Sequence, residues 1–401
     1  MAANTFPASN LPLLNSTALP VNASSVILDG SLTSASTYTT TVNGNGGIAY
    51  LTATDNPATI TISGTAYSVP ANTVVVSKAF GASTSVIVAA NFIAPATFTA
   101  STMPSSSLWV GVAYGNGYYV AVAYNTSAGA YSTNGTSWTA STMPSSSYWQ
   151  SVTYGNGYFV AVSGNPSTVG AYSTNGTTWT ASTLPSSSNW TGVTYGLVGT
   201  TPTYVAVQSS GTTAGAYSTN GTSWNASTMP SAGSATGWLA VAYGNGYFVA
   251  TASGTTAGAY STNGTTWTAN TMPGVYSWLG VAYGNGYYVA VANSATGAYS
   301  TNGTTWTAST MPSNSTWASV TYGNGYFFAV AQSTTAGAYS TNGTTWTAST
   351  MPSASSWYSV TYGNGYFVAV QLSGTTAGAY FAQLPILPVN FGIYAGPTAI
   401  H

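Results

Sequence analysis

Residues that could carry acid–base, ionic or metal-binding chemistry are nearly missing from this 401-residue chain. It contains one Lys, no Arg, two acidic residues and one His, so 1% of its residues are charged, where an ordinary soluble protein has about 25%. The three formal charges, Asp29, Asp55 and Lys78, all lie before residue 79, and the His is the last residue, His401. Any ionic chemistry is therefore confined to the ends of the chain.

This composition argues against whole classes of function. Nucleic-acid binding needs Lys and Arg to neutralise phosphates, and anionic membrane surfaces attract basic clusters. Glycoside hydrolysis by a carboxylate pair needs two acids beside one bond, a catalytic triad needs an internal His, and zinc needs Cys, His or carboxylates. We therefore expect no enzymatic activity, no cofactor, no metal and no nucleic-acid partner. No run of 18 apolar residues occurs, so we also expect no membrane insertion.

The side chains that remain for recognition are aromatic rings, hydroxyls and amides. Tyr124, Tyr148 and Tyr276 lie in segments that vary between otherwise similar units of the sequence. Variable loops on a rigid scaffold are common recognition sites, and aromatic faces beside hydroxyls and amides suit uncharged sugars. These tyrosines are the candidate glycan- or partner-binding residues. The alternative is that these loops vary because nothing constrains them.

The elements that must position these loops come from an internal repeat. One unit contains Trp109-Val-Gly-Val-Ala-Tyr114, a Gly-Asn-Gly turn, Tyr118-Tyr-Val-Ala-Val122, and later Gly129-Ala-Tyr-Ser-Thr133. It ends with Asn134-Gly135 and Thr136-Ser-Trp138-Thr-Ala-Ser-Thr-Met-Pro144. The first Trp of the unit recurs at spacings of 40, 41, 48, 40, 39 and 40 residues, at Trp149, Trp190, Trp238, Trp278, Trp317 and Trp357.

Each unit predicts four antiparallel strands. Its runs alternate and are rich in strand-forming residues, and Asn-Gly predicts a tight hairpin of type I′ between the third and fourth strands. Met-Pro is expected to end the fourth strand. Four strands repeated about every 40 residues indicate an all-β fold, a seven-bladed β-propeller with four-stranded antiparallel blades.

The ends of the repeat region predict a closed ring. The seventh unit departs from the pattern after Tyr380 and lacks its fourth strand, whereas Phe98-Thr-Ala-Ser-Thr-Met-Pro104 supplies a copy of that strand with Phe98 in the Trp position. We expect residues 97–102 to complete the last blade, which would also protect a strand edge. A linear solenoid would not need complementary fragments at its two ends.

The turn Ser132-Thr-Asn134-Gly135-Thr-Ser-Trp138 resembles the Asp-box, the Ser-x-Asp-x-Gly-x-x-Trp turn of sialidase-type propellers, although Asn replaces Asp and one residue before Gly is missing. The resemblance implies a structural turn between the third and fourth strands of each blade. The whole unit also resembles repeats of phage tail and virion proteins. Sialidase activity does not carry over, because the chain has no Arg and no Glu. The predicted structural turns are Asn134-Gly135, Asn175-Gly176, Asn220-Gly221, Asn263-Gly264, Asn302-Gly303 and Asn342-Gly343.

Three parts follow from this organisation: residues 1–94, an extended arm plus a small all-β anchoring module; residues 95–382, the propeller; and residues 383–401, an apolar tail. The tail is expected either to pack on the first module or to dock on a partner chain. The start of the chain lacks a basic segment and a long apolar run, so we expect no secretion signal.

Taken together, these features favour a structural or interaction protein of a phage virion, such as a tail fibre, head fibre or capsid decoration. Other virion proteins would contact residues 1–94 and the tail in an oligomeric assembly, and the propeller would face outward, where it could bind neutral host glycans. The alternative is a lectin or adhesin on a bacterial cell surface.

Overall fold

The computed structural model describes residues 97–382, apart from 211–212, 234–236, 373 and 375–376, together with the backbone pairing of nine strands outside that range. The chain divides into two compact units, one of Met1–Ile93 with Gln383–His401 and one of Ala94–Ala382. The extended arm expected at the start of residues 1–94 lies outside the described residues.

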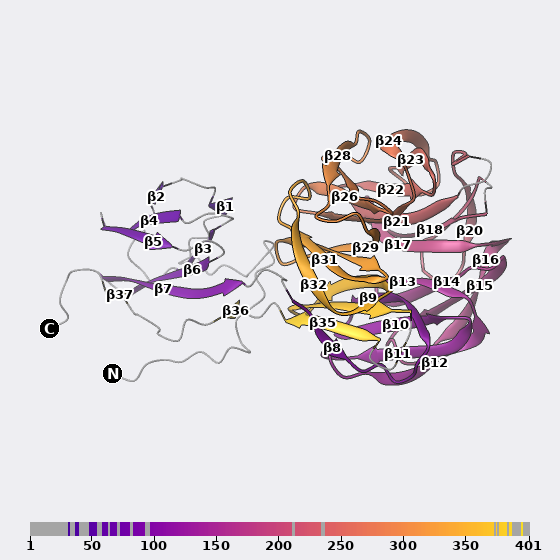
Figure 1. Ribbon diagram of the computed structural model, residues 1–401, viewed down its shortest axis with the longest axis horizontal. Coiled ribbons are helices and arrows are strands. Elements are labelled where there is room, and N and C mark those ends of the chain that lie inside the picture. Colours follow the sequence, from indigo (N-terminus) through magenta and orange to yellow (C-terminus); the bar gives the residue numbers. More distant parts are fainter. Residues whose placement is uncertain are drawn as a thin grey trace. The chain divides into compact units, whose positions relative to one another are not determined.

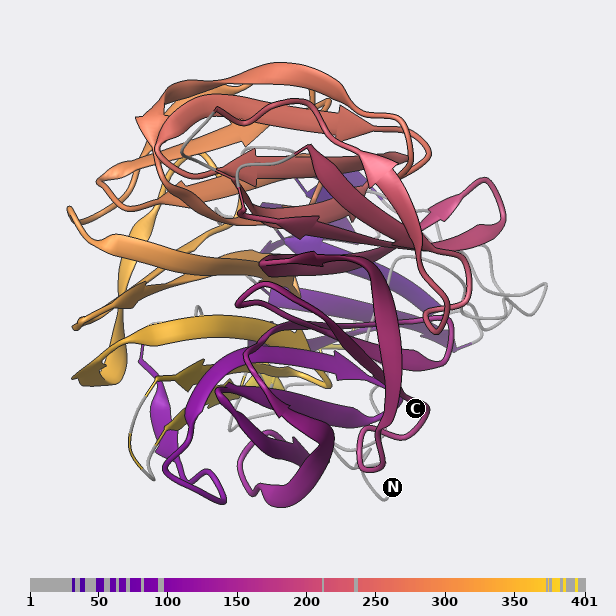
Figure 2. The same cartoon turned by 90° about the vertical axis from the view of Figure 1, so that its right-hand side faces the viewer.

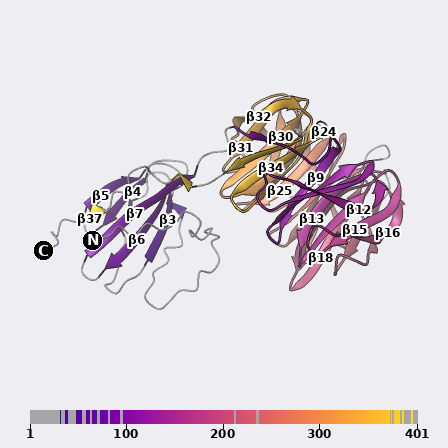
Figure 3. The same cartoon turned by 90° about the horizontal axis from the view of Figure 1, so that it is seen from below.

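The first unit contains two sheets (Figure 3). One has the strand order β1-β3-β6-β7-β36, with β37 also paired to β7, and the other has the order β2-β4-β5. Both strands of the C-terminal tail pair antiparallel with β7. Of the two alternatives expected for the tail, the structure therefore shows packing on the first module. The strands are β1 (Ser31–Leu32), β2 (Thr37–Thr39), β3 (Ile48–Ala53), β4 (Ala58–Ile62), β5 (Thr65–Val69), β6 (Thr73–Phe80), β7 (Ser83–Phe92), β36 (Pro385–Ile386) and β37 (Tyr394–Ala395).

The second unit is a seven-bladed propeller, as predicted, and each blade is a four-stranded antiparallel sheet (Figures 1 and 2). Blade 1 contains β9 (Leu108–Gly115), β10 (Tyr118–Tyr124), β11 (Thr126–Ser132) and β12 (Thr139–Ser147); blade 2 contains β13 (Trp149–Gly155), β14 (Tyr158–Ser163), β15 (Ser167–Ser173) and β16 (Thr180–Ser188). Blade 3 contains β17 (Trp190–Val198), β18 (Thr201–Gln208), β19 (Ala214–Ser218) and β20 (Asn225–Thr228); blade 4 contains β21 (Trp238–Gly244), β22 (Tyr247–Ala252), β23 (Thr255–Ser261) and β24 (Thr268–Tyr276). Blade 5 contains β25 (Trp278–Gly284), β26 (Tyr287–Ala292), β27 (Thr296–Ser300) and β28 (Thr307–Thr310); blade 6 contains β29 (Thr316–Gly323), β30 (Tyr326–Gln332), β31 (Thr334–Ser340) and β32 (Thr347–Ser355). Blade 7 contains β33 (Trp357–Gly363), β34 (Tyr366–Gln371), β35 (Gly378–Ala382) and β8 (Thr99–Ser101).

The ring closes through the N-terminal strand β8, as predicted. β8 pairs antiparallel with β35, so that Thr99 lies opposite Tyr380 and Ser101 opposite Gly378. Phe98 is buried at 3% exposure, and its ring stacks on Phe328 of blade 6 at a centroid distance of 4.5 Å. The first and last segments of the propeller are thereby joined within one blade.

The core lies between neighbouring blades, and large aromatic side chains fill it. The first Trp of every unit is fully buried. In six of the seven units its indole nitrogen donates to the backbone carbonyl four residues earlier, for example from Trp357 to Ser353 at 3.0 Å. These tryptophans are therefore structural, which agrees with their strict recurrence in the sequence.

Met-Pro, or Leu-Pro in blade 2, does not end the fourth strand in four of the blades, contrary to the prediction. The strands β12, β24 and β32 continue through Met-Pro, and β16 continues through the equivalent Leu184-Pro185. A register shift accompanies the change, since Ala128 pairs with Thr142 but Thr126 pairs with Ser147. The bulge leaves the proline out of the hydrogen-bonded ladder, where its missing N–H costs nothing.

Candidate functional site

The Asn-Gly turns join the third and fourth strands of blades 1 to 6 by a different geometry from the one predicted. In these turns only the Gly has a positive φ, 73° at Gly135, whereas a type I′ turn requires two positive φ values. The Gly-Asn-Gly turns between the first and second strands meet that requirement, with φ values of 48° at Asn116 and 81° at Gly117. The prediction of a type I′ Asn-Gly hairpin is therefore wrong for Asn134 and its equivalents.

The Asn side chain holds this turn instead. Asn134 Oδ1 accepts hydrogen bonds from the backbone N–H groups of Thr136 and Ser137, each at 2.9 Å. Ser132 Oγ accepts from the N–H of Gly135 at 2.9 Å and donates to Asn134 Oδ1 at 3.0 Å. A neutral amide thus satisfies backbone donors where a carboxylate would carry a charge. The same set recurs at Asn175-Gly176, Asn220-Gly221, Asn263-Gly264, Asn302-Gly303 and Asn342-Gly343.

The structure brings together two of the three candidate tyrosines. Tyr124 and Tyr148 are half-buried, and their rings meet edge to face at a centroid distance of 4.8 Å. Tyr276 is not part of this pair, because it packs edge to face against Trp278 at 5.7 Å. The three residues therefore belong to two separate places on the propeller.

A further tyrosine, Tyr358, was missed from the sequence and lies near Tyr124. Burial raises the pKa of Tyr358, and the neighbouring Tyr124 phenol raises it further. Tyr358 occupies the bulged position between Trp357 and Ser359, which is skipped in the pairing with β34. The sequence could have identified it, because the other units have Val, Gln, Thr, Leu or Ala after the first Trp.

Buried tyrosines also link neighbouring blades by hydrogen bonds. Tyr288 of blade 5 donates from its hydroxyl to the backbone carbonyl of Gly244 in blade 4, and Tyr119 and Tyr204 make equivalent bonds. Burial is the main cause that raises the pKa of each of these phenols. Phe occupies this position in the other four blades. The buried phenols therefore stabilise blade packing and are not poised for proton transfer near neutral pH.

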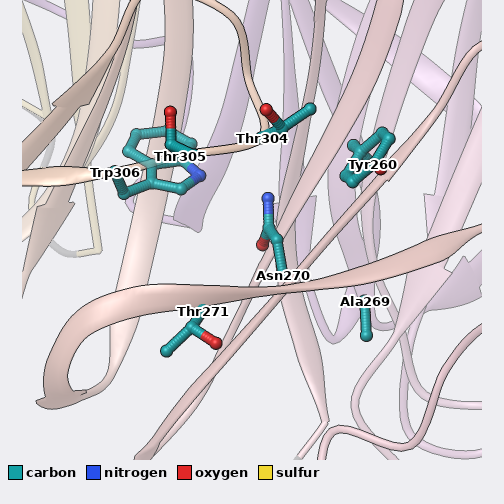
Figure 4. A pocket seen from close by; sticks show the side chains of 7 residues that line it. All are labelled: Tyr260, Ala269, Asn270, Thr271, Thr304, Thr305 and Trp306. Carbon is teal, nitrogen blue, oxygen red and sulfur yellow. The ribbon is translucent and has the colours of Figure 1, made fainter.

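No metal-binding set is found within the part of the chain that the structure describes: it has no group of three or more His, Cys, Asp or Glu side chains. Among the same residues, no helix is long and apolar enough to cross a membrane. A pocket of about 480 Å³ lies between blades 4 and 5 and is lined in part by Asn270 and Trp306 (Figure 4). The sequence analysis missed it, although Asn270 stands where the other units have Ser.

Comparison with solved structures defines the class of the second unit as a β-propeller domain. Similar structures include streptogramin B lyase, with 14% identity, a TM-score of 0.62, and 71% of this chain and 96% of that chain covered. YCF48 bound to D1 peptide has 14% identity and a TM-score of 0.55, with 72% and 96% covered. The WD40 β-propeller domain of Doa1 has 11% identity and a TM-score of 0.55, with 71% and 96% covered. No family model and no curated protein matches the chain.

These similarities correct one prediction. We expected no enzymatic activity, but streptogramin B lyase is an enzyme with the same propeller fold. At 12–14% identity the similarity shows the fold alone, and this fold is compatible with both an enzyme and a binding protein. The physical reason is that activity depends on the residues placed at a site and not on the scaffold that carries them.

Proposed function

We propose that the protein is a component of a tailed-phage virion, such as a tail fibre, head fibre or capsid decoration. In this proposal the first unit, with both chain ends, anchors the protein to other virion proteins. The propeller is displayed outward, with its variable loops available to neutral host glycans. The resemblance of the repeat to those of phage tail and virion proteins agrees with this role.

The observation that carries the proposal is the absence of formal side-chain charge from the whole propeller sequence, residues 95–382. A neutral surface rich in hydroxyls is neither repelled by nor held to charged polymers and cell surfaces. It also lacks the charge repulsion that keeps free proteins apart in solution. Both properties suit a subunit that is built into an assembly and meets foreign surfaces.

Mass spectrometry of purified particles tests this proposal. We expect the full-length chain to co-purify with particles through a density gradient, at a constant ratio to the major capsid protein. Particle-free supernatant from the same lysate is the matched control. Recovery of the chain only from that supernatant would contradict a virion location.

A second candidate is a bacterial surface lectin or adhesin, which the grouping of Tyr124, Tyr148 and Tyr358 favours. Half-buried aromatic rings beside hydroxyl groups suit a neutral sugar face. On a glycan array, saturable binding that Tyr148→Ala abolishes and Tyr276→Ala leaves intact would support a site at the Tyr124–Tyr148 pair. Loss in Tyr276→Ala alone would assign binding to the Tyr276 loop, and a blank array would count against this function.

A further inference from the structure

One of the seven junctions between blades is built differently from the rest. At six junctions a parallel backbone bridge joins the fourth strand of one blade to the residue before the second Trp of the next blade, or to the residue before Phe98 in blade 7. The bridges are Thr102–Ser137, Thr142–Thr178, Thr183–Ser223, Thr228–Thr266, Thr310–Thr345 and Thr350–Thr97. The corresponding residues between blades 4 and 5 are Thr271 and Thr305, which do not form the bridge. These two blades are therefore not joined along their outer edge as the others are.

Asn270 explains the difference. The equivalent residue is Ser in every other blade: Ser101, Ser141, Ser182, Ser227, Ser309 and Ser349. Asn270 lies opposite Gly258 on the neighbouring strand, and its longer side chain reaches into blade 5, where Nδ2 donates to the carbonyl of Gly303 at 3.0 Å. The amide thus occupies the space between the blades and replaces the backbone bridge with a side-chain contact.

A wide-open hollow of about 480 Å³ lies at this junction. Figure 4 shows the Asn270 amide between the rings of Trp306 and Tyr260, with Thr304 and Thr271 nearby. Two aromatic rings, an amide and several hydroxyls therefore line one open hollow.

Polar atoms at this pocket lack partners. Trp306 Nε1 and Asn270 Oδ1 are both buried without a hydrogen bond, which is costly for a polar group. In blade 6 the equivalent Trp346 Nε1 donates to the carbonyl of its own Gly343 at 3.2 Å. In blade 5 the corresponding carbonyl, that of Gly303, accepts from Asn270 instead.

Blades 1 to 4 also have an unpaired indole nitrogen at this position, at Trp138, Trp179, Trp224 and Trp267. Those junctions, however, keep the backbone bridge that the Asn270 junction lacks. In Figure 4 the Trp306 nitrogen lies on the side of the ring that faces Asn270. The hydroxyls of the equivalent Ser101, Ser141, Ser182, Ser227 and Ser309 are also buried without a partner, so unpaired polar groups alone do not distinguish this junction. What distinguishes it is that the missing bridge and the replaced serine coincide where the pocket lies.

We propose that this pocket, defined by Tyr260, Asn270, Thr271, Thr304 and Trp306, binds one or two residues of an uncharged saccharide. Its lining has no acidic or basic side chain, so a sulfated or sialylated ligand would find no countercharge. The aromatic faces would contact the C–H face of a sugar ring, and the threonine hydroxyls would pair with its hydroxyl groups. The site is separate from the Tyr124–Tyr148 pair and does not depend on a virion location.

Binding of the full-length protein to neutral sugars tests the proposal. Saturation-transfer NMR would screen glucose, galactose, mannose, fucose, N-acetylglucosamine and N-acetylgalactosamine, with N-acetylneuraminic acid as the charged comparison, and titration would follow for any sugar that binds. We expect at least one neutral sugar to bind saturably and the acid not to bind.

Asn270→Ser is the decisive variant, because it gives this junction the residue of the other six. We expect it to unfold at the same temperature as the wild type or higher, and to bind the sugar at least tenfold more weakly. Trp306→Phe keeps a ring but reduces the aromatic face, and should also weaken binding. Tyr148→Ala is the matched control and should bind as the wild type does.

Two results would overturn the proposal. One is that no neutral sugar in the panel binds the wild type. The other is that binding survives Asn270→Ser and Trp306→Phe unchanged, including the case in which only Tyr148→Ala abolishes it. Neither result bears on whether the chain is found in particles, so the two proposals fail independently.

Discussion

Replacing Phe98 by Ala should open the ring at blade 7. Phe98 is 3% exposed; its ring stacks on Phe328 at 4.5 Å and lies 5.8 Å from the ring of Phe381. Truncating a buried Phe costs about 3–5 kcal/mol, a large part of the roughly 5–15 kcal/mol that stabilises a typical protein. For a unit of this size, we expect the melting temperature to fall by about 5–10 °C.

The other junctions supply a matched control. Where blade 7 has Phe98 against Phe328, the equivalent junctions have Trp against Val, as with Trp179 and Val120 in one core cluster. Phe98→Trp alone should overpack the site and cost about 1–3 kcal/mol. The double variant Phe98→Trp/Phe328→Val reproduces the other junctions and should recover most of that loss, which a double-mutant cycle would measure as favourable coupling.

Urea unfolding of the full-length protein, followed by far-ultraviolet circular dichroism, measures these changes without depending on the altered tryptophan content. A loss below about 1 kcal/mol for Phe98→Ala, far under the usual cost of truncating a buried Phe, would refute closure through β8. So would additive effects in the cycle, since residues in contact should couple.

Three further predictions concern the repeated contacts. Asn175→Ala removes the acceptor of two backbone N–H groups at 3.0 Å each and should cost about 1 kcal/mol in urea unfolding, whereas Asn175→Asp keeps the acceptor and should cost less. Tyr288→Phe leaves the carbonyl of Gly244 without its hydroxyl donor and should cost about 1–2 kcal/mol, while the fold survives because Phe stands at this position in four blades; an unchanged midpoint would show that the hydroxyl contributes nothing. Burial raises the pKa of Tyr362 to about 12, so the folded state keeps its proton in a range where the unfolded chain, with a tyrosine pKa of about 10, loses it. That contribution to stability is complete below about pH 10 and is lost between about pH 10 and pH 12. The melting temperature should therefore be constant from about pH 5 to pH 9 and fall above pH 10. A marked shift of the melting temperature below pH 9 would contradict this.

The repeat made most of the propeller predictable. Seven near-copies of one unit reveal strands and turns by comparison with one another, and Phe98 followed by Thr-Ala-Ser-Thr identified the missing strand of the last blade. The Asn-Gly turn was predicted wrongly because a dipeptide preference was applied where side-chain oxygens decide the geometry. Ser132 and Asn134 bond the turn's N–H groups, so Asn134 does not need a positive φ.

The candidate site was less predictable because it depends on single departures from the repeat. Asn270 is a single substitution for Ser in an otherwise repeated segment. Its amide nevertheless bonds to Gly303 of the next blade, and this junction has no backbone bridge. Loop variability identified Tyr124 and Tyr148, but Tyr358 lies within a strand, at a bulge that only the pairing register reveals. A position that varies inside a repeated strand is thus as informative as a variable loop.

The pairing of β8 with β35 also has a mechanical consequence. The chain passes from the first unit into the propeller just before Thr99 and leaves it after Ala382, and Thr99 lies opposite Tyr380 in the ladder. Both covalent connections therefore enter the same blade at the same end. When the first unit is anchored and a ligand bound to the propeller is pulled, the entire pulling force is transmitted through blade 7. We expect force spectroscopy to record an early rupture event at β8 and β35, before the six blades whose strands are continuous in the chain begin to unfold.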